Sequence, residues 1–360
     1  MSSATIIGLG TIGSAVASLV ARMPEISHLT LVDPDGYTES NLVNQAIDTS
    51  APGKPKVEVQ AALIHAIDPQ IRVDVIEAQV ENVPLACMDS SILVSCVDNR
   101  SARQTINRIA WRCGKPWIDA AVGAPSLVRI NAYVPGESAP CIECSWDERS
   151  YDLLDQEYPC DAGAIPVPAT DTPAELGTIA ASLQVGELRR LLGGAANDAS
   201  LVGAQLMIDT ATHARHLCRL ERNELCRFDH EVWKIEAAAL SSQESTLANL
   251  FDAVDDRSDS AISLEGHSFA TTVDCVACGR RSTVGLSLYG RLSMDERSCS
   301  CGGRMFAPGF FSFEAIRRSD LSATNMGLTL AAVGLQSGDV ISVTEGPGTA
   351  RHIEIRDGAV

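Results

Sequence analysis

At 360 residues the chain exceeds the usual length of one compact domain, which favours two units over one. It has 28 basic and 46 acidic residues, a formal net charge of −18 with no basic run, and this excludes a general nucleic-acid binder. No stretch approaches the ~18 apolar residues of a membrane span, and the opening has no basic segment of a signal peptide. We therefore expect a cytoplasmic protein with neither membrane nor nucleic-acid partners.

The first 135 residues alternate apolar runs with amphipathic stretches. Strands are expected at 5–10, 29–33, 71–78, 92–98 and 116–122, and helices at 14–23, 56–67 and 100–113. Such alternation predicts an α/β fold with a doubly wound, mainly parallel, Rossmann-like sheet. Ligands of these sheets bind beyond the carboxyl ends of the strands, which places the glycines near residue 10, Asp33 and Asp98 around one crevice.

The first expected strand runs into a glycine-rich turn, "GLGTIG", with Gly8, Gly10 and Gly13. Such a turn lets the backbone approach a phosphate, and the following helix directs free N–H groups at the negative charge. Asp33 ends the second strand, where an acid accepts hydrogen bonds from ribose hydroxyls of NAD, FAD or ATP. The motif therefore indicates an adenosine ligand but no particular reaction.

The segment after Asp33 distinguishes between a dinucleotide and a triphosphate as the ligand. In "VDPDGYTESNLVNQAIDTSAPGKPKVEV" the strand is followed by four polar side chains that a dinucleotide site does not need and that suit a triphosphate: Asn41, Gln45, Lys54 and Lys56.

The pattern changes after residue 135. A long loop at about 150–175 contains Cys160, and loops of that length are typically functional or disordered. The stretch 205–223 fits either one helix or two strands. The polar segment 236–265 is interpreted as a linker with one short helix, between a domain at 1–235 and a C-terminal unit at 266–360 that ends in a hairpin at 335–355.

The C-terminal unit contains "DCVACG" and "SCSCGG", which supply Cys275, Cys278, Cys299 and Cys301. Structural zinc takes four thiolate or imidazole ligands in a tetrahedron, and closely spaced cysteine pairs in tight turns bring their sulfurs to one metal. The pattern predicts a zinc-ribbon-containing, β-rich domain.

The chain resembles the ThiF/MoeB/HesA family of adenylating enzymes, relatives of the ubiquitin-activating enzymes, across roughly residues 4–230. Five motifs occur in the family's order: "GLGTIGS", "LVDPDGYTESNLVNQ", "GKPKVE", "SCVDN" and "PCIEC". The resemblance implies that Asp33 binds the ribose, that Asn41, Gln45 and Lys56 hold the triphosphate, and that Asp98 ligates Mg²⁺.

The reaction implied by the resemblance is attack of a C-terminal carboxylate on ATP, which gives an acyl-adenylate and pyrophosphate. The substrate would be a ubiquitin-like protein, a sulfur-carrier protein or a peptide. Cys160 lies at a position similar to the family cysteine of the transfer step, in "CDAGAIP". Lys56, Asp98 and Cys160 are thus the expected catalytic residues.

The chain departs from the family pattern at two places, and each departure leaves out an arginine that contacts ATP in the family. Asn44 stands where the family has a phosphate-binding arginine, and the chain begins directly at its first strand, where relatives carry a helix whose arginine reaches the neighbouring subunit's ATP. Arg100, Arg103 or Lys54 would compensate, or a partner would supply an arginine in trans. We expect a homodimer or a heteromeric partner.

The resemblance also bears on a second metal site. The family completes its first cysteine pair, here Cys141 and Cys144, with a later Cys-x-x-Cys; "ERNELCRFDH" offers Cys226 and His230, or Asp229 in place of the histidine. Two complete tetrahedra, and so two zinc ions, are preferred over the alternative of one zinc that pools Cys141 and Cys144 with Cys275 and Cys278.

The other cysteines, Cys87, Cys96, Cys113 and Cys218, are expected to be small buried hydrophobic residues. His213 and His216 are expected to be surface or core residues rather than ligands.

Two other functions remain open. A non-catalytic adaptor of the same fold would explain the absent arginines, and a nicotinamide-dependent oxidoreductase would leave Asn41 and Lys56 without a purpose.

Overall fold

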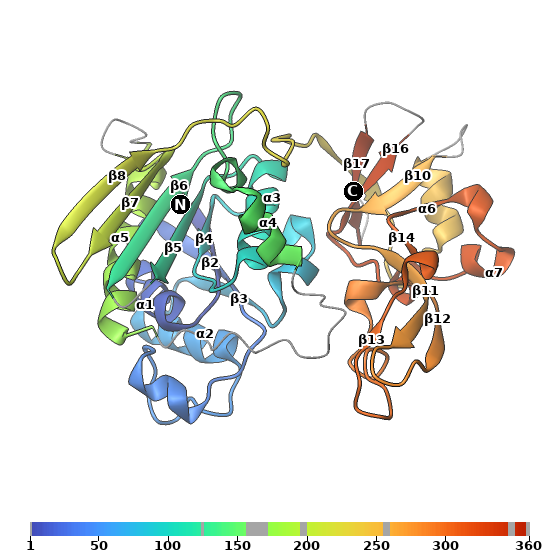
Figure 1. Cartoon of the computed structure of the whole chain (residues 1–360), viewed down its shortest axis with the longest axis horizontal. Helices are drawn as coiled ribbons and strands as arrows, with labels where there is room; N and C mark the ends of the chain where they lie inside the picture. Colours follow the sequence, from blue (N-terminus) through green and yellow to red (C-terminus); the bar gives the residue numbers. More distant parts are fainter. Residues whose placement is uncertain are drawn as a thin grey trace. The chain divides into compact units, whose positions relative to one another are not determined.

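The computed structural model describes residues 2–123, 126–155, 172–194, 200–254, 260–344 and 350–357. The chain divides into two units (Figure 1). The first unit comprises Met1–Val83, Met88–Tyr158 and Ile165–Val232, and the second comprises Pro84–Cys87, Pro159–Ala164 and Trp233–Val360.

The first unit is built on an eight-stranded sheet with the order β3-β2-β1-β4-β5-β6-β7-β8 (Figure 1). The strands from β3 to β5 are parallel, whereas β6, β7 and β8 are antiparallel to their neighbours. The strands are β1 Ser2–Ile7, β2 Ile26–Val32, β3 Arg72–Ile76, β4 Ile92–Ser95, β5 Trp117–Gly123, β6 Leu127–Tyr133, β7 Ala204–Asp209 and β8 Ala214–Arg219.

Helices cover both faces of this sheet. The described ones are α1 Thr11–Val20, α2 Lys56–Ile67, α3 Arg100–Arg112, α4 Glu148–Asp155 and α5 Ala174–Leu192, with short 3-10 turns η1 Glu39–Val43, η2 Val80–Asn82, η3 Leu85–Met88 and η4 Ile142–Ser145. Apolar residues of α1, α2 and α5 pack in one cluster with the inward side chains of β1, β4, β5 and β6. Helix α3 packs against β4 and β5.

The strand order reverses between β1 and β4, whose following helices α1 and α3 lie on opposite faces. Ligands of doubly wound sheets bind at this switch point, beyond the carboxyl ends of the strands. The predicted α/β fold with a mainly parallel sheet is confirmed. Helix α1 begins at Thr11, three residues before the predicted start, because the glycine turn itself leads into the helix.

The stretch 205–223, for which one helix or two strands were expected, forms the hairpin of β7 and β8. Two cysteine predictions were wrong, because Cys87 and Cys218 are exposed. Cys218 lies on β8, whose side chains are mostly solvent-exposed because it is the edge strand of the sheet. Cys96 is buried as predicted, and Cys113 is half-buried. His213 and His216 are exposed.

The second unit contains two small sheets. The five-stranded sheet has the order β15-β10-β16-β17-β9, and the other has the order β12-β11-β13 with β14 also paired to β11. The strands are β9 Ile235–Ala239, β10 Ala261–Leu264, β11 Phe269–Cys275, β12 Arg281–Leu288, β13 Met305–Phe306, β14 Ser312–Phe313, β15 Ala315–Arg317, β16 Val340–Thr344 and β17 Ala350–Arg356. The helices are α6 Leu247–Val254, α7 Ala323–Met326 and α8 Leu330–Val333, with turns η5 Tyr289–Arg291, η6 Gly309–Phe311 and η7 Arg318–Asp320.

The stretch 236–265 differs from the expected linker. It forms most of β9, all of α6 and all of β10, which are integral to the second unit: β9 pairs with β17, and Leu247, Leu250 and Phe251 of α6 are fully buried. The one short helix expected in this stretch is α6, whereas the polar composition did not indicate that the helix buries an apolar face and that strands flank it. The expected hairpin at 335–355 is present as β16 and β17. Among the described residues, no helix is both long and apolar enough to cross a bilayer.

Candidate functional site

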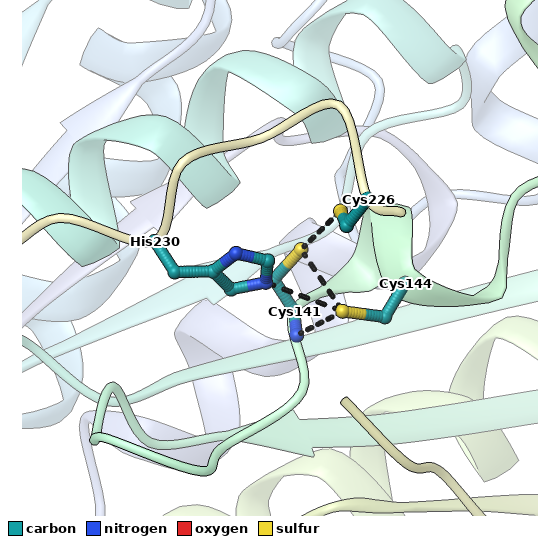
Figure 2. Close-up of side chains that lie close together, drawn as sticks. All are labelled: Cys141, Cys144, Cys226 and His230. Carbon is teal, nitrogen blue, oxygen red and sulfur yellow. Dashed lines mark hydrogen bonds between the residues drawn. The ribbon is translucent and has the colours of Figure 1, made fainter. Parts of the chain in front are cut away.

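Four side chains from two distant segments converge in the first unit (Figure 2). Cys141 is the N-cap residue of the turn η4 and Cys144 lies within it, whereas Cys226 and His230 come from the segment after β8. The Sγ of Cys141 lies 3.8 Å from the Sγ of both Cys144 and Cys226, and His230 Nε2 lies 3.2 Å from Cys144 Sγ. Since a tetrahedron with Zn–S arms of about 2.3 Å has edges of about 3.8 Å, the sulfurs fit a zinc ion.

His230 is held in place by its surroundings. Its backbone adopts a left-handed conformation, with φ of 62°, that is uncommon for residues other than glycine. Its ring makes edge-on contacts with Trp111 and Phe228 at centroid distances of 4.9 and 5.3 Å. The adjacent Asp229 points elsewhere and forms a paired hydrogen bond with Arg112, so the imidazole is the fourth candidate ligand.

A second group, Cys275, Cys278, Cys299 and Cys301, lies in the second unit. The Sγ atoms of Cys275 and Cys301 are 3.5 Å apart, and those of Cys278 and Cys299 are 3.7 Å apart. The backbone N–H of Cys278 lowers the pKa of Cys275 to about 6, which favours the thiolate that metals require. The eight side chains thus gather in two separate groups of four, which is the grouping preferred from the sequence, rather than in one pooled group.

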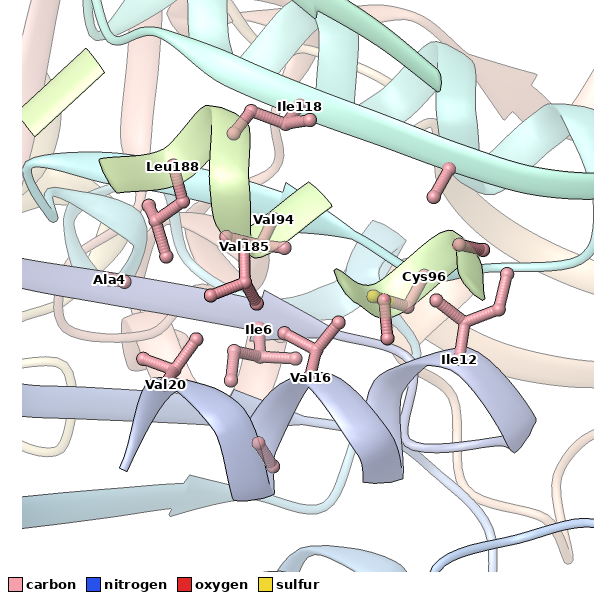
Figure 3. Packing of buried hydrophobic residues seen from close by; sticks show 14 of the residues in the cluster. Ala4, Ile6, Ile12, Val16, Val20, Val94, Cys96, Ile118, Val185 and Leu188 are labelled. Atoms are coloured by element: carbon pink, nitrogen blue, oxygen red, sulfur yellow. The ribbon is translucent and has the colours of Figure 1, made fainter. Parts of the chain in front are cut away.

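Of the three glycines that follow β1, two are required because the neighbouring backbone leaves no room for a Cβ atom. Gly8 has φ of 86°, and a Cβ atom there would meet the carbonyl oxygen of Cys96 at 2.8 Å. A Cβ on Gly13 would lie 1.8 Å from the carbonyl oxygen of Gly8. This close packing continues along α1, whose Ile12 and Val16 face the strands and Cys96 (Figure 3).

Gly10 differs from the other two. It precedes α1 as the N-cap residue, and among the described residues other than Gly10 and its two chain neighbours no atom lies within 4 Å of the position that its Cβ would take. The open space lies over the start of α1, where free N–H groups attract a phosphate. The residues therefore fit a nucleotide phosphate that approaches Gly10 closely.

We predict opposite effects of alanine at these two glycines. Gly10→Ala is expected to change the free energy of unfolding by less than about 0.5 kcal/mol and to weaken ATP binding at least about tenfold. Gly13→Ala is expected to destabilise the first unit by more than about 3 kcal/mol, because Gly8 has no room to move. Thermal unfolding and calorimetric titration with ATP measure both effects; unchanged ATP affinity in Gly10→Ala would contradict the assignment.

Asp33 connects the glycine loop to the end of β2. Its Oδ2 accepts a hydrogen bond from the N–H of Leu9 at 2.6 Å, and its Oδ1 accepts one from the N–H of Asp35 at 2.9 Å. Burial raises the pKa of Asp33 above its ordinary value, against the opposing effect of the Lys56 ammonium. The carboxylate lies where the sequence predicted, at the carboxyl end of the strand beside the loop.

Lys56 is nine-tenths buried at the start of α2 and is already paired. Its Nζ lies 3.0 Å from Asp35 Oδ2 and 3.7 Å from Asp33 Oδ1. The Asp35 side chain is 64% exposed, so this carboxylate can leave the ammonium at little cost. Lys56 thus presents a positive charge beside Asp33 that a phosphate could take over from Asp35.

Asn41 and Gln45 lie in and just after η1. The carboxamide oxygen of Asn41 accepts hydrogen bonds from Thr38 N–H and Thr38 Oγ1, which leaves its NH₂ group as the part that can reach a ligand. Within the described part of the chain, Gln45 Oε1 is buried and accepts no hydrogen bond. Asn44, which replaces the family arginine, donates to the carbonyl of Thr172.

Asp98 follows β4 and is exposed, with the Nδ2 of Asn99 3.4 Å from its Oδ1. Arg100 and Lys54 are also exposed. Arg103 is 8% exposed and is bound to Asp119, so it cannot replace an absent phosphate contact. Cys160 lies outside the described residues.

Tyr37 was not predicted from the sequence, although its side chain contacts the glycine-rich loop after β1. Its hydroxyl donates to the carbonyl of Leu9 at 2.9 Å and accepts from Gln60 Nε2 at 2.8 Å. Tyr37 is 2% exposed. The signal in the sequence was an aromatic residue in an otherwise polar segment, four residues after Asp33.

Comparison with protein families gives one assignment. The model of the ThiF family matches residues 1–228, which is more than half of the chain.

Curated relatives agree with this match. The chain is 28% identical over 225 residues to the molybdopterin-synthase adenylyltransferase of Escherichia coli K12, covering 61% of this chain and 84% of that protein. It is 27% identical over 235 residues to ubiquitin-like modifier-activating enzyme 5 of Dictyostelium discoideum, covering 58% and 57% of the two chains. The chain thus spans little more than half the length of the second relative.

Among solved structures, E. coli MccB in a complex with succinimide resembles the chain with a TM-score of 0.51 and 23% identity, covering 63% of this chain and 66% of MccB. Another structure of similar likeness contains MccB with AMPCPP and MccA. At this identity the likeness concerns the fold alone.

Proposed function

The chain belongs to the ThiF family, and from this we propose that it is an ATP-dependent adenylyltransferase. Its substrate would be the C-terminal carboxylate of a ubiquitin-like protein, a sulfur-carrier protein or a peptide. The observation that carries the proposal is the arrangement at the carboxyl ends of β1 and β2. There Gly10 leaves open space over α1, Asp33 binds the loop, and Lys56 carries a displaceable positive charge.

The names of the relatives support this reaction class, since one is an adenylyltransferase and several are ubiquitin-like modifier-activating enzymes.

In the proposed reaction, five residues near the glycine loop and the end of β4 have a role. A carboxylate oxygen of the substrate attacks the α-phosphorus of ATP, the bond to the β-phosphate oxygen breaks, and pyrophosphate leaves. Lys56 exchanges Asp35 for phosphate oxygens and stabilises the negative charge that develops there. Asp98 is an exposed carboxylate, the kind of oxygen ligand that Mg²⁺ takes, and bound Mg²⁺ supplies charge neutralisation. Asp33 binds the ribose, and Asn41 and Gln45 bind phosphate oxygens.

In this proposal, each of the two cysteine groups binds one zinc ion. In a further step of the proposed reaction, the Cys160 thiolate attacks the carbonyl carbon of the acyl-adenylate, a thioester forms and AMP leaves. We also propose that a second subunit, identical or different, supplies the arginine that Asn44 does not provide. A purified chain that reaches its full rate as a monomer, with no other protein but its substrate, would contradict this last point.

The test is substrate-dependent exchange of pyrophosphate into ATP, with small proteins that end in Gly-Gly as substrates. Exchange is expected with the unmodified chain and is expected to fall at least about 100-fold in Lys56→Ala, which removes the charge beside the α-phosphate. Lys115→Ala is the matched control, because Lys115 forms a surface ion pair with Asp89. Equal exchange rates in both variants would show that Lys56 has no role in the reaction.

The adaptor remains a second candidate, favoured by Asn44 at the arginine position and by the burial of Arg103. ATP binding without exchange on any tested substrate would support it. Saturable NADH binding without ATP binding would instead support an oxidoreductase.

A further inference from the structure

A buried ion pair lies beneath Asp98, on the face of the sheet that α3 covers. Asp119 of β5 is 1% exposed, and its Oδ1 accepts hydrogen bonds from Ser95 Oγ at 2.8 Å and from Arg103 Nε at 2.9 Å. Arg103 belongs to α3. Neither charge has a role in the proposed reaction, although an ion pair this deep carries a large desolvation cost.

The other end of the Arg103 guanidinium holds the main chain around Asp98. Its Nη2 donates to the carbonyl of Val97, and its Nη1 lies 3.4 Å from the carbonyl of Asn99. These two carbonyls belong to the residues on either side of Asp98. The planar fork of an arginine can bind a carboxylate and two carbonyls at once, which a single ammonium cannot do.

Asp98 depends on such support. Residue 97 onward lies beyond the last ladder residue of β4, and α3 begins only at Arg100. The Asp98 side chain is exposed, and its contact with Asn99 Nδ2 is long, at 3.4 Å. Its carboxylate is therefore oriented mainly by the backbone of residues 97–99, which Arg103 binds on one side and the Asn99 cap of α3 fixes on the other.

The charge of Asp119 in turn fixes Arg103. Arg129 Nη2 lies 3.9 Å from Asp119 Oδ2, so a second positive charge offsets part of the burial of this carboxylate. Among the described residues, Oδ2 itself accepts no hydrogen bond. The Oδ1 atom alone therefore carries the contacts that orient the guanidinium.

We propose that Arg103 and Asp119 are positioning residues that hold Asp98 ready to bind Mg²⁺. This inference rests on the proposed function, in which Asp98 is the Mg²⁺ ligand. Groups that orient metal ligands typically change metal affinity 10–100-fold when they are removed. A merely structural ion pair would instead change the stability of the fold and leave the Mg²⁺ dependence unaltered.

The experiment uses the full chain and three substitutions. Arg103→Lys keeps the charge opposite Asp119 but loses the fork to Val97 and Asn99. Asp119→Asn removes the charge that orients Arg103, and Ser95→Ala removes one hydroxyl contact to Asp119 and leaves the ion pair. Arg190→Lys is the matched control, because Arg190 pairs with the buried Glu187 at 2.8 Å on α5.

Calorimetry measures the affinity for ATP, first in EDTA and then as a function of Mg²⁺ concentration. In Arg103→Lys and Asp119→Asn, the Mg²⁺ concentration for half-saturation is expected to rise about tenfold, with ATP affinity in EDTA unchanged. Ser95→Ala is expected to shift in the same direction by less, and Arg190→Lys not to shift. Amide hydrogen exchange at residues 97–99 is expected to speed up in the first two variants.

An unshifted Mg²⁺ dependence in folded Arg103→Lys would overturn the inference, and so would an equal loss of ATP affinity with and without Mg²⁺. If Arg103→Lys and Asp119→Asn do not fold, Ser95→Ala takes their place, and an unshifted Mg²⁺ dependence in that variant would overturn the inference. The variant Asp98→Ala distinguishes failure of the proposed function from failure of the positioning role. If its Mg²⁺ dependence equals that of the unmodified chain, the assignment of Asp98 as the Mg²⁺ ligand fails, and not only the positioning role of Arg103 and Asp119.

Discussion

Asp98→Ala is expected to lower the rate of substrate-dependent pyrophosphate exchange by about 100-fold or more, with the thermal unfolding temperature unchanged. The rate falls because Mg²⁺ loses its carboxylate ligand at the end of β4 and no longer offsets charge on the phosphates. Stability is preserved because the side chain is exposed and makes one long contact. Exchange of labelled pyrophosphate into ATP at saturating substrate measures the effect.

Asp89→Ala is the control for this substitution. Asp89 is also an exposed carboxylate of the first unit, and it forms a surface ion pair with Lys115 at 2.7 Å. Surface pairs of this kind contribute about 0–1 kcal/mol, so exchange and stability should both stay near those of the unmodified chain. A loss of less than threefold in Asp98→Ala would contradict its assignment as the Mg²⁺ ligand.

The second large effect is expected from the metal centres. Elemental analysis of the purified chain should give two zinc ions. Cys278→Ser and Cys144→Ser should each lower this number to one, because each site has four ligands and a closed shell. Structural zinc contributes about 10–16 kcal/mol in small peptides, comparable to the whole stability of a domain.

The two substitutions should differ in where the structure is lost. Around the second cysteine group, the apolar cluster is small, with Val273, Leu292 and Met305 beside Cys275 and Cys299. Cys278→Ser should therefore unfold residues 269–306, seen as rapid amide exchange and proteolysis there. Cys144→Ser should lower the unfolding temperature of the first unit but leave it folded, because its large core is intact.

Cys218→Ser is the control, since Cys218 is exposed on β8 and belongs to neither group. It should keep two zinc ions and an unchanged unfolding temperature. One zinc ion in the unmodified chain would contradict the model of two filled sites.

Much of the first unit could be predicted from local sequence. The strands β2 to β5 and the helix α2 lie close to where apolar runs and helical spacing placed them, because these patterns depend on neighbouring residues alone. The strand β1 was predicted at 5–10 and spans Ser2–Ile7, three residues earlier. The glycine loop and Asp33 were also recognisable, since a strand, a turn and a helix in succession constrain one another. The polar composition of 236–265 was misleading, because α6 buries one apolar stripe within it.

Tertiary structure alone decided how residues far apart in the chain are paired. Arg112 meets Asp229 across 117 positions, and Arg103 meets Asp119 rather than a phosphate. It also separated Gly13, which the neighbouring backbone requires, from Gly10, which faces open space. The sequence by itself determined the chemical types of the site residues and the local elements that carry them. Burial, distance and choice of partner came from the packing of the whole sheet, because they depend on contacts that no local pattern encodes.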